Sequence, residues 1–300
     1  MLTEGREGIY MEVNGKTRLC GLIGNPIEHT LSPMIHNALA EKLNHNLIYV
    51  PFKVEESQVK EAVQGAYALN VLGLNVTVPH KSTVINCLKE MDGLASSIGA
   101  VNTLVRVNGG YKGYNTDMSG LYRALLSEGI QVKGEDILLL GAGGAARAVA
   151  FMCAYYGAAN IYILNRTIEK AKLVAEEVNN VLKTSVVVPM RLSDYGHLMN
   201  KKYLVIQGTS VGLYPHVEDV IIEDEEFYKH VHTGYDLIYR PAKTKFMLQV
   251  EAAGGKAYHG LKMLLFQGID AYEMWNQTQI SEKMALEVYE LLKKEMGIHG

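Results

Sequence analysis

Residues 136–147 read DILLLGAGGAAR, in which an apolar run leads through a glycine-rich loop into a series of small residues. The apolar run predicts a buried strand over Ile137–Leu140, and the small residues predict a helix over Ala145–Tyr156. A second apolar run predicts another strand over Ile161–Leu164. A glycine pattern alone is weak evidence, but a strand, a glycine loop, a helix and a strand in this order predict a Rossmann dinucleotide-binding unit.

The glycine loop has the residue types that a bound dinucleotide needs. Gly141 permits the tight turn, Gly143 lets a pyrophosphate approach the backbone, and Ala146 is small enough for close packing of helix on strand. The phosphates would then face the positive end of the helix that begins at Ala145. A plain helix contact between small residues is the structural alternative. The predicted cofactor-binding residues of the loop are Gly141, Ala142, Gly143, Gly144 and Ala145.

The end of the second strand decides which dinucleotide fits. A site that prefers NAD usually carries a carboxylate there for the ribose hydroxyls, whereas residues 164–167 read LNRT and contain no acid. Arg166 can grip the extra phosphate of NADP, and Lys170 adds positive charge one turn later. Thr167 can also be only the N-cap of the following helix, and the two roles are compatible. We therefore predict NADP as the cofactor, bound here by Asn165, Arg166, Thr167 and Lys170.

Composition and charge exclude several classes of protein. The chain has 300 residues, 48% of them hydrophobic, which favours two domains with packed cores over disorder. A net charge of -3 lacks the basic surplus of a nucleic-acid-binding protein, and no apolar run is long enough to span a membrane. Residues 1–18 lack the apolar stretch of a secretory signal, and Cys20, Cys87 and Cys153 have no metal-ligand spacing. We expect a cytoplasmic protein with reduced thiols and no bound metal.

Short apolar runs alternate with helical patterns along the chain, which predicts an α/β fold with mostly parallel sheets. Further strands are expected at Arg18–Ile23, Leu47–Phe52, Gly73–Val76, Leu204–Ile206 and Tyr235–Leu237, and residues 101–107 and 111–112 resemble a hairpin. Helices are expected at Pro33–Leu43 with Ser32 as N-cap, Gln58–Leu69, Ser82–Leu88, 117–127, Lys243–Glu251, Leu261–Asn276 and Ser281–Met296.

Two polar stretches upstream of the glycine loop carry side chains that can exchange protons. Residues 73–81 read GLNVTVPHK, and residues 113–117 read GYNTD. Hydride delivery to a ketone leaves an alkoxide, and the ammonium group of Lys81 can donate the proton and stabilise the developing charge. Asp117 would favour the charged form of Lys81 by attraction, whereas burial would oppose it. The structural alternatives are a solvated Lys81 at the start of a helix and Asp117 as a helix N-cap.

A third polar stretch lies nearer the start of the chain. Residues 24–37 read GNPIEHTLSPMIHN and place the hydroxyls of Thr30 and Ser32 at the N-terminus of a predicted helix. Hydroxyl and backbone donors at such a position suit a carboxylate group. Simple capping of the helix is an equally open interpretation of this fragment.

Together these stretches resemble shikimate dehydrogenases, from Arg18 onward over nearly the whole chain. The ordered motifs are PIxHxxSPxxHN, NVTVPHK, GAVNT at residues 99–103, GYNTD, GAGGAAR with NRT, and GLKMLLFQ at residues 260–267. The resemblance implies an N-terminal α/β substrate domain, residues 1–117, completed by the C-terminal helices of residues 260–300. A Rossmann-type NADP-binding domain would cover residues 118–259. The implied activity is the reversible, NADPH-dependent reduction of 3-dehydroshikimate to shikimate, and a homodimer is compatible with it.

The resemblance also implies roles for individual residues. Lys81 and Asp117 would form the catalytic pair. The ring hydroxyls would be held by Asn75, Thr77, Asn102 and Gln267. The substrate carboxylate would meet Thr30, Ser32 and Tyr239. Thr209 and Ser210 would border the nicotinamide side of the cofactor.

Two positions depart from the usual pattern of this family. Thr30 stands where serine is usual, which keeps the hydroxyl but adds a methyl group and leaves the acceptance of quinate open. Gln207 and Gly208 stand where asparagine and alanine are usual. One alternative is therefore a quinate/shikimate dehydrogenase with NAD or dual cofactor use. Another is a nucleotide-sensing protein that has lost the chemistry, although the complete set of polar residues argues against that.

Overall fold

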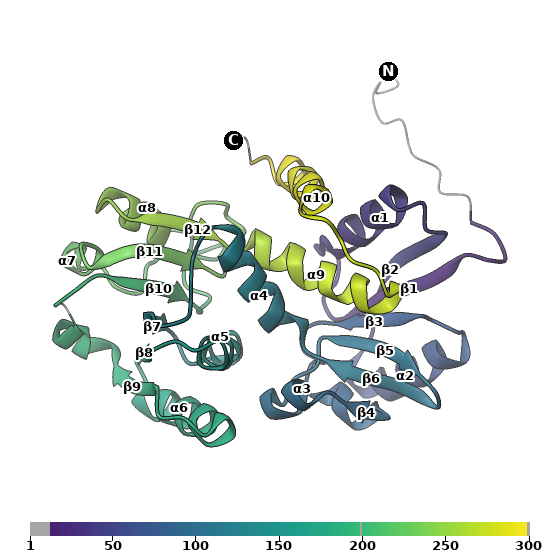
Figure 1. Cartoon of the computed structure of the whole chain (residues 1–300), viewed down its shortest axis with the longest axis horizontal. Coiled ribbons are helices and arrows are strands. Elements are labelled where there is room, and N and C mark those ends of the chain that lie inside the picture. Colours follow the sequence, from purple (N-terminus) through teal and green to yellow (C-terminus); the bar gives the residue numbers. More distant parts are fainter. Residues whose placement is uncertain (1–12, 199, 299–300) are drawn as a thin grey trace. The chain divides into compact units, whose positions relative to one another are not determined.

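A computed structural model describes residues 13–198 and 200–298 (Figure 1). The chain forms two compact units. The first comprises residues 13–95, 99–114 and 271–292, and the second comprises residues 96–98, 115–270 and 293–298. The domain boundaries expected near residues 117 and 260 stay predictions, and residues 1–12 and 299–300 of the expected first domain lie outside the described residues.

The sheet of the first unit has the strand order β2-β1-β3-β5-β6-β4. Both neighbours of β1 run parallel to it, whereas β5 runs antiparallel to β3 and to β6. The predicted hairpin is therefore confirmed. The strands are β1 (Arg18–Gly24), β2 (Leu47–Lys53), β3 (Gly73–Val76), β4 (Glu90–Met91), β5 (Thr103–Val107) and β6 (Gly110–Tyr114).

Helices α1 and α2 pack against strands of this sheet. A core of aliphatic side chains from β1, β3 and α2 includes Ile23, Val63 and Leu74, each at most 3% exposed. The indole Nε1 of Trp275 donates to the carbonyl oxygen of Leu104 at 2.9 Å, so the end of α9 is fixed to β5. The helices that lie wholly or partly in this unit are α1 (Ser32–Lys42), α2 (Val59–Ala68), α3 (Gly93–Ile98), α9 (Leu261–Asn276) and α10 (Glu282–Glu295).

The sheet of the second unit has the order β12-β11-β10-β7-β8-β9, and every neighbouring pair is parallel. Renumbered from β7, this is the order 3-2-1-4-5-6 of a Rossmann fold, as the glycine loop predicts. Figure 1 shows α5 and α6 together beside β8 and β9, and α8 beside β11 and β12. The strands are β7 (Asp136–Leu140), β8 (Asn160–Asn165), β9 (Val187–Arg191), β10 (Tyr203–Gln207), β11 (Val231–Asp236) and β12 (Lys256–His259). The helices are α4 (Thr116–Ser127), α5 (Gly144–Tyr155), α6 (Ile168–Leu182), α7 (Glu225–Tyr228) and α8 (Lys245–Ala252).

Several local expectations were wrong. Ser32 is the first residue of α1, and Leu31 takes the cap position. Asp117 lies inside the first turn of α4, where its backbone N–H donates to the side chain of Asn115, the true N-cap. The segment after Lys81 is a short 3₁₀ helix, Thr83–Cys87. Thr167 does occupy the cap position of α6, but its side chain makes no capping hydrogen bond.

Among the described residues, no helix is both long and apolar enough to cross a membrane.

Candidate active site

Thr30 and Ser32 lie together at the start of α1. The hydroxyl of Thr30 donates to the Ser32 hydroxyl oxygen, and the backbone N–H of Ser32 donates to Thr30 Oγ1, both at 3.2 Å. Pro33, at the beginning of the helix, has no N–H that would compete for this position. The arrangement gathers two hydroxyls beside the positive end of a helix, which suits a carboxylate.

Lys81 is held by its main chain at the end of the loop that follows β3. Its carbonyl oxygen accepts a hydrogen bond from Val101 N–H at 2.8 Å, and Asn102 O accepts one from Val76 N–H at 2.8 Å. The ring of buried His80 donates from Nε2 to the carbonyl oxygen of Val54 at 2.7 Å. Lys81 is therefore brought next to Asn102, as the shared motifs predict for one site.

Asn75 lies at the centre of a buried hydrogen-bond network in the same unit. Its amide oxygen accepts from the Tyr49 hydroxyl at 2.8 Å, and its amide nitrogen lies 3.2 Å from Thr103 Oγ1. Asn75 is 4% exposed and Thr103 is fully buried. Sequence reasoning missed Tyr49 and Thr103, because a tyrosine in an apolar strand and a threonine in a hairpin look like ordinary strand residues.

The second unit brings two other predicted residues onto neighbouring helices. Asp117 is in the first turn of α4, and Gln267 lies in α9, where its Nε2 donates to Leu264 O at 2.8 Å. A Cβ atom on Gly120 of α4 would lie 2.5 Å from Gln267 N. The two helices therefore meet at Gly120.

Tyr239 follows β11 in a turn that a buried carboxylate organises. Asp236 accepts the backbone N–H of Ile238 at 2.9 Å and the hydroxyl of Thr244 at 2.6 Å. Burial raises the pKa of Asp236 to about 6, although both hydrogen bonds act in the opposite direction. Burial also raises the pKa of Tyr239, so its hydroxyl remains a donor at neutral pH.

The glycine loop has the form that a pyrophosphate requires. Gly141 has φ +109°, a conformation that favours glycine, and α5 begins at Gly144. A Cβ atom added to Gly143 or Gly144 would meet no atom within 4 Å, so the backbone there faces open space. The N–H groups at the start of a helix suit the phosphates of a dinucleotide, and the space beside these two glycines lets a phosphate approach.

The loop after β10 packs directly on the glycine loop. A Cβ atom on Gly141 would lie 2.6 Å from Thr209 Cγ2, and one on Gly208 would lie 3.1 Å from Ala146. These loops follow β7 and β10, the two strands between which the strand order reverses. Ligands of doubly wound sheets bind at this switch point. Thr209 therefore lies at this switch point, and contact of Thr209 and Ser210 with a cofactor stays a prediction.

Gln207 shapes this loop. Its Nε2 donates to Val211 O at 3.0 Å, and its Oε1 accepts Thr209 N–H at 2.5 Å. The side chain is buried, with 1% exposed. Glutamine replaces the usual asparagine here, and its side chain bridges Thr209 N–H and Val211 O within the loop.

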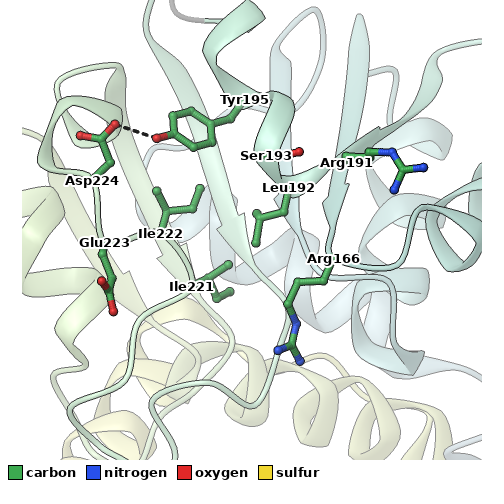
Figure 2. A pocket seen from close by; sticks show the side chains of 9 residues that line it. All are labelled: Arg166, Arg191, Leu192, Ser193, Tyr195, Ile221, Ile222, Glu223 and Asp224. Carbon is green, nitrogen blue, oxygen red and sulfur yellow. Dashed lines mark hydrogen bonds between the residues drawn. The ribbon is translucent and has the colours of Figure 1, made fainter.

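Arg166 lines a pocket of about 530 Å³ at the ends of β8 and β9. Figure 2 shows Arg166 and Leu192 on one side and Ile221–Asp224 on the other, with a Tyr195–Asp224 hydrogen bond of 2.6 Å. Arg191 also lines the pocket. It pairs with Asn165 across the two strands, and the sequence did not reveal it because β9 was not predicted.

The cofactor residues fit a phosphorylated dinucleotide better than a metal ion. Asn165 Nδ2 donates to Thr167 O at 2.8 Å, which shapes the turn that presents Arg166. Lys170 lies in the first turn of α6 and is exposed. Among residues 13–198 and 200–298, no cluster of three or more His, Cys, Asp or Glu side chains could hold a metal.

Comparisons with known proteins agree with this geometry. Residues 22–104 match the family model described as the shikimate dehydrogenase substrate binding domain, and residues 124–230 match that of shikimate/quinate 5-dehydrogenase. The shikimate dehydrogenase (NADP(+)) of Desulforamulus reducens is 43% identical over 268 residues, which cover 89% of this chain and 92% of that protein. The enzyme of the same name from Methanothermobacter thermautotrophicus is 42% identical over 269 residues, covering 88% and 92%.

Solved structures are similar over the same length. A shikimate dehydrogenase crystallised with NADP+ has a TM-score of 0.84 and 36% identity, covering 94% of this chain and 97% of its own. Shikimate 5-dehydrogenase from Listeria monocytogenes, in complex with shikimate and NAD, has a TM-score of 0.87 and 31% identity, covering 95% and 99%. On this similarity of sequence and fold, the chain belongs to the shikimate dehydrogenase family.

Proposed function

We propose that this protein catalyses the reversible, NADPH-dependent reduction of 3-dehydroshikimate to shikimate, a step in aromatic amino acid biosynthesis. The observation that carries the proposal is the open glycine loop at the switch point of the second sheet, beside a strand end with Arg166 and no acid. NADPH, when bound, supplies the hydride. The protein must supply binding, orientation and a proton.

The cofactor would be held mainly by backbone groups and by one guanidinium. The N–H groups of Gly143 and Gly144 suit the pyrophosphate, and Arg166 suits the 2′-phosphate that distinguishes NADP from NAD. Thr209, whose side chain lies against Gly141, and Ser210 would border the nicotinamide end. NADP is the cofactor named for the relatives in D. reducens and M. thermautotrophicus.

Lys81 would donate a proton to the oxygen of the reduced carbonyl group. An ammonium group both supplies the proton and stabilises the negative charge that develops on that oxygen. Asp117 would be the second member of the catalytic pair. In the reverse direction the amine must be neutral to accept the alcohol proton, so oxidation of shikimate should become faster as the pH rises.

The remaining predicted residues would recognise the substrate. Its hydroxyls would be held by Thr77, Asn102 and Gln267, with Asn75 in their support. Its carboxylate would be held by Thr30, Ser32 and Tyr239. We also place the protein in the cytoplasm, which accords with the free thiols of Cys20, Cys87 and Cys153. A homodimer stays a prediction.

One comparison of rates tests the proposal. The specificity constant kcat/KM is measured for shikimate and for quinate, each with NADP+ and with NAD+. The highest value is expected for shikimate with NADP+. A higher value for quinate or for NAD+ would favour the quinate/shikimate dehydrogenase with relaxed cofactor use. A protein that binds NADPH but oxidises none of it with 3-dehydroshikimate would be a nucleotide sensor instead.

A further inference from the structure

Four buried side chains in the first unit, including that of Asn102, are linked by hydrogen bonds. The hydroxyl of Tyr49 donates to Asn75 Oδ1 at 2.8 Å, and Asn75 Nδ2 donates to Thr103 Oγ1 at 3.2 Å. The hydroxyl of Thr103 then donates to Asn102 Oδ1 at 3.1 Å. The four side chains are at most 4% exposed. We call these residues, Tyr49, Asn75, Thr103 and Asn102, the amide relay.

The direction of the amide relay follows from the donor capacity of each group. A primary amide has two N–H donors on nitrogen and only acceptor sites on oxygen. The second N–H of Asn75 donates to Asn102 O at 3.3 Å, so both of its donors are engaged within the protein. Asn75 therefore has no N–H left for a substrate hydroxyl, which favours a supporting role for it, and its predicted role as a ligand stays a prediction.

The relay also determines which way the Asn102 amide points. The oxygen and the nitrogen of an amide have nearly the same shape, so packing alone distinguishes poorly between its two orientations. Because Thr103 donates a hydrogen to Asn102 Oδ1, the oxygen is fixed on that side and Nδ2 lies on the opposite side. The side of Asn102 away from Thr103 therefore carries N–H donors, and such a donor suits a hydroxyl or carbonyl oxygen of the substrate.

We propose that Tyr49 is a positioning residue for the reaction, which acts through Asn75 and Thr103 to hold the Asn102 amide in its donor orientation toward the substrate. The inference rests on the proposed function, in which Asn102 contacts the substrate. Tyr49 itself touches neither substrate nor cofactor in this proposal. Its hydroxyl is the first donor of the relay, and without it the amide oxygen of Asn75 loses a buried hydrogen bond that helps to hold this amide in place.

The surroundings of Tyr49 keep its hydroxyl protonated. Burial raises the pKa of Tyr49 well above its usual value, and a hydrogen bond with Ser32 opposes that shift only in part. The ring of His36 stacks on the Tyr49 ring with centroids 4.1 Å apart and planes 12° from parallel. Burial lowers the pKa of His36 to about 3, so this ring is neutral at working pH. The donor at the start of the relay is thus constant over the pH range of assays.

The test uses the substitution Tyr49→Phe, which removes one hydroxyl and keeps the stacked ring. Tyr111→Phe is the matched control, because Tyr111 is 1% exposed in the same unit and donates to Val71 O at 2.7 Å outside the relay. For each variant and for wild type, we would measure kcat and KM for shikimate oxidation, the Kd of NADPH by fluorescence, and Tm. For Tyr49→Phe we expect kcat/KM for shikimate to fall about tenfold or more, the scale of one lost substrate hydrogen bond. The Kd of NADPH should be unchanged.

Tyr111→Phe should lower Tm about as much as Tyr49→Phe does. It should leave kcat/KM for shikimate within twofold of the wild-type value. Equal losses of kcat/KM in the two variants would overturn the proposal, because a general loss of stability would then explain both. A wild-type protein that does not oxidise shikimate at all would instead refute the proposed function. The two failures are therefore distinguishable.

A second set of variants tests the relay without changing Tyr49. Thr103→Val breaks the relay, whereas Thr103→Ser keeps the hydroxyl and should restore most of the lost activity. In a double-mutant cycle, Tyr49→Phe combined with Thr103→Val should cost little more than Thr103→Val alone, because both break one chain of hydrogen bonds. Additive losses, or a serine variant as impaired as the valine variant, would refute the relay. If Tyr49→Phe does not fold, the valine and serine pair decides the question.

Discussion

Gly120 of α4 lies so close to Gln267 of α9 that a Cβ atom on Gly120 would stand 2.5 Å from the backbone nitrogen of Gln267. This contact joins the helix that carries Asp117 to the helix that carries a predicted substrate ligand. It also shows why a glycine occurs inside a helix, where it is unfavourable by about 1 kcal/mol relative to alanine. The second helix needs the space that a side chain would fill.

We expect Gly120→Ala to impair substrate binding although alanine is the better helix former. The added methyl group must push α9 away from α4 and displace Gln267, so KM for shikimate should rise several-fold and Tm should fall. Gly65→Ala is the matched control, since an added Cβ atom in α2 meets no atom within 4 Å. That variant should gain about 0.4–1 kcal/mol in free energy of unfolding. A Gly120→Ala protein with unchanged KM and a raised Tm would contradict this expectation, because α4 and α9 would then have room for the methyl group.

The sequence predicted the nucleotide unit well because its central strands are buried on both faces. Ile137–Leu140 and Ile161–Leu164 are continuous apolar runs, and a glycine loop that leads from such a strand into a helix is typical of a dinucleotide site. β9 was missed, since Val187–Arg191 contains a proline and ends in an arginine at the edge of the sheet. With β9 unknown, the position of Arg191 beside Arg166 could not be predicted.

The candidate site was predictable as a set of residues but not as a network. Motifs named Asn75 and Asn102, yet nothing in the spacing of Tyr49, Asn75 and Thr103 indicates that their side chains meet. Those contacts depend on the register of strands that are far apart in the chain. The predicted helix caps were wrong for a related reason. Ser32, Asn115 and Asp117 are all good capping residues, and only the backbone geometry decides which residue takes the cap position.

Gln207 should matter for the cofactor rather than for the substrate. Its side chain bridges Thr209 N–H and Val211 O, so Gln207→Leu frees the loop that borders the glycine loop. At about 1 kcal/mol for each hydrogen bond, we expect the Kd of NADPH to rise about tenfold, as measured by fluorescence titration. Gln207→Glu keeps the acceptor for Thr209 and should show a smaller rise. Equal affinities for NADPH in the wild type and the leucine variant would exclude this role.

Arg166 should set the preference between NADP and NAD. Arg166→Asp removes the cation that suits the 2′-phosphate and adds a repelling charge, so the Kd of NADP+ should rise about a hundredfold or more. The Kd of NAD+, which lacks that phosphate, should change only a few-fold. Arg191→Asp, in the same pocket, is the control for a general change of charge and should have the smaller effect. An unaltered ratio of the two Kd values in Arg166→Asp would contradict the assignment.

His36 should make the stability of the protein fall at acid pH. Burial lowers its folded-state pKa to about 3, against about 6.5 in the unfolded chain. Below pH 6.5 the unfolded state therefore binds a proton that the folded state does not, and stability falls by up to about 1.4 kcal/mol per pH unit until about pH 3. Urea unfolding between pH 4 and pH 7.5 should show a shallower decline for His36→Phe than for wild type. Parallel curves for the two proteins would mean that the pKa of His36 is the same in the folded and the unfolded state.

Lys81 should be indispensable for turnover but not for folding. Lys81→Ala should lower kcat by about 10²–10⁴-fold, the usual contribution of a positioned acid or base, with Tm near that of wild type. Lys60→Ala, which removes an exposed lysine from α2 in the same unit, should leave kcat unchanged.

Lys81→Arg separates the charge of this residue from its proton. A guanidinium keeps the positive charge but does not deprotonate in proteins, so it cannot accept the proton of an alcohol. Shikimate oxidation by this variant should stay as low as in Lys81→Ala and should not rise with pH, whereas the wild-type rate should rise. If the arginine variant oxidised shikimate with the wild-type pH profile, the positive charge alone would suffice and another group would have to carry the proton.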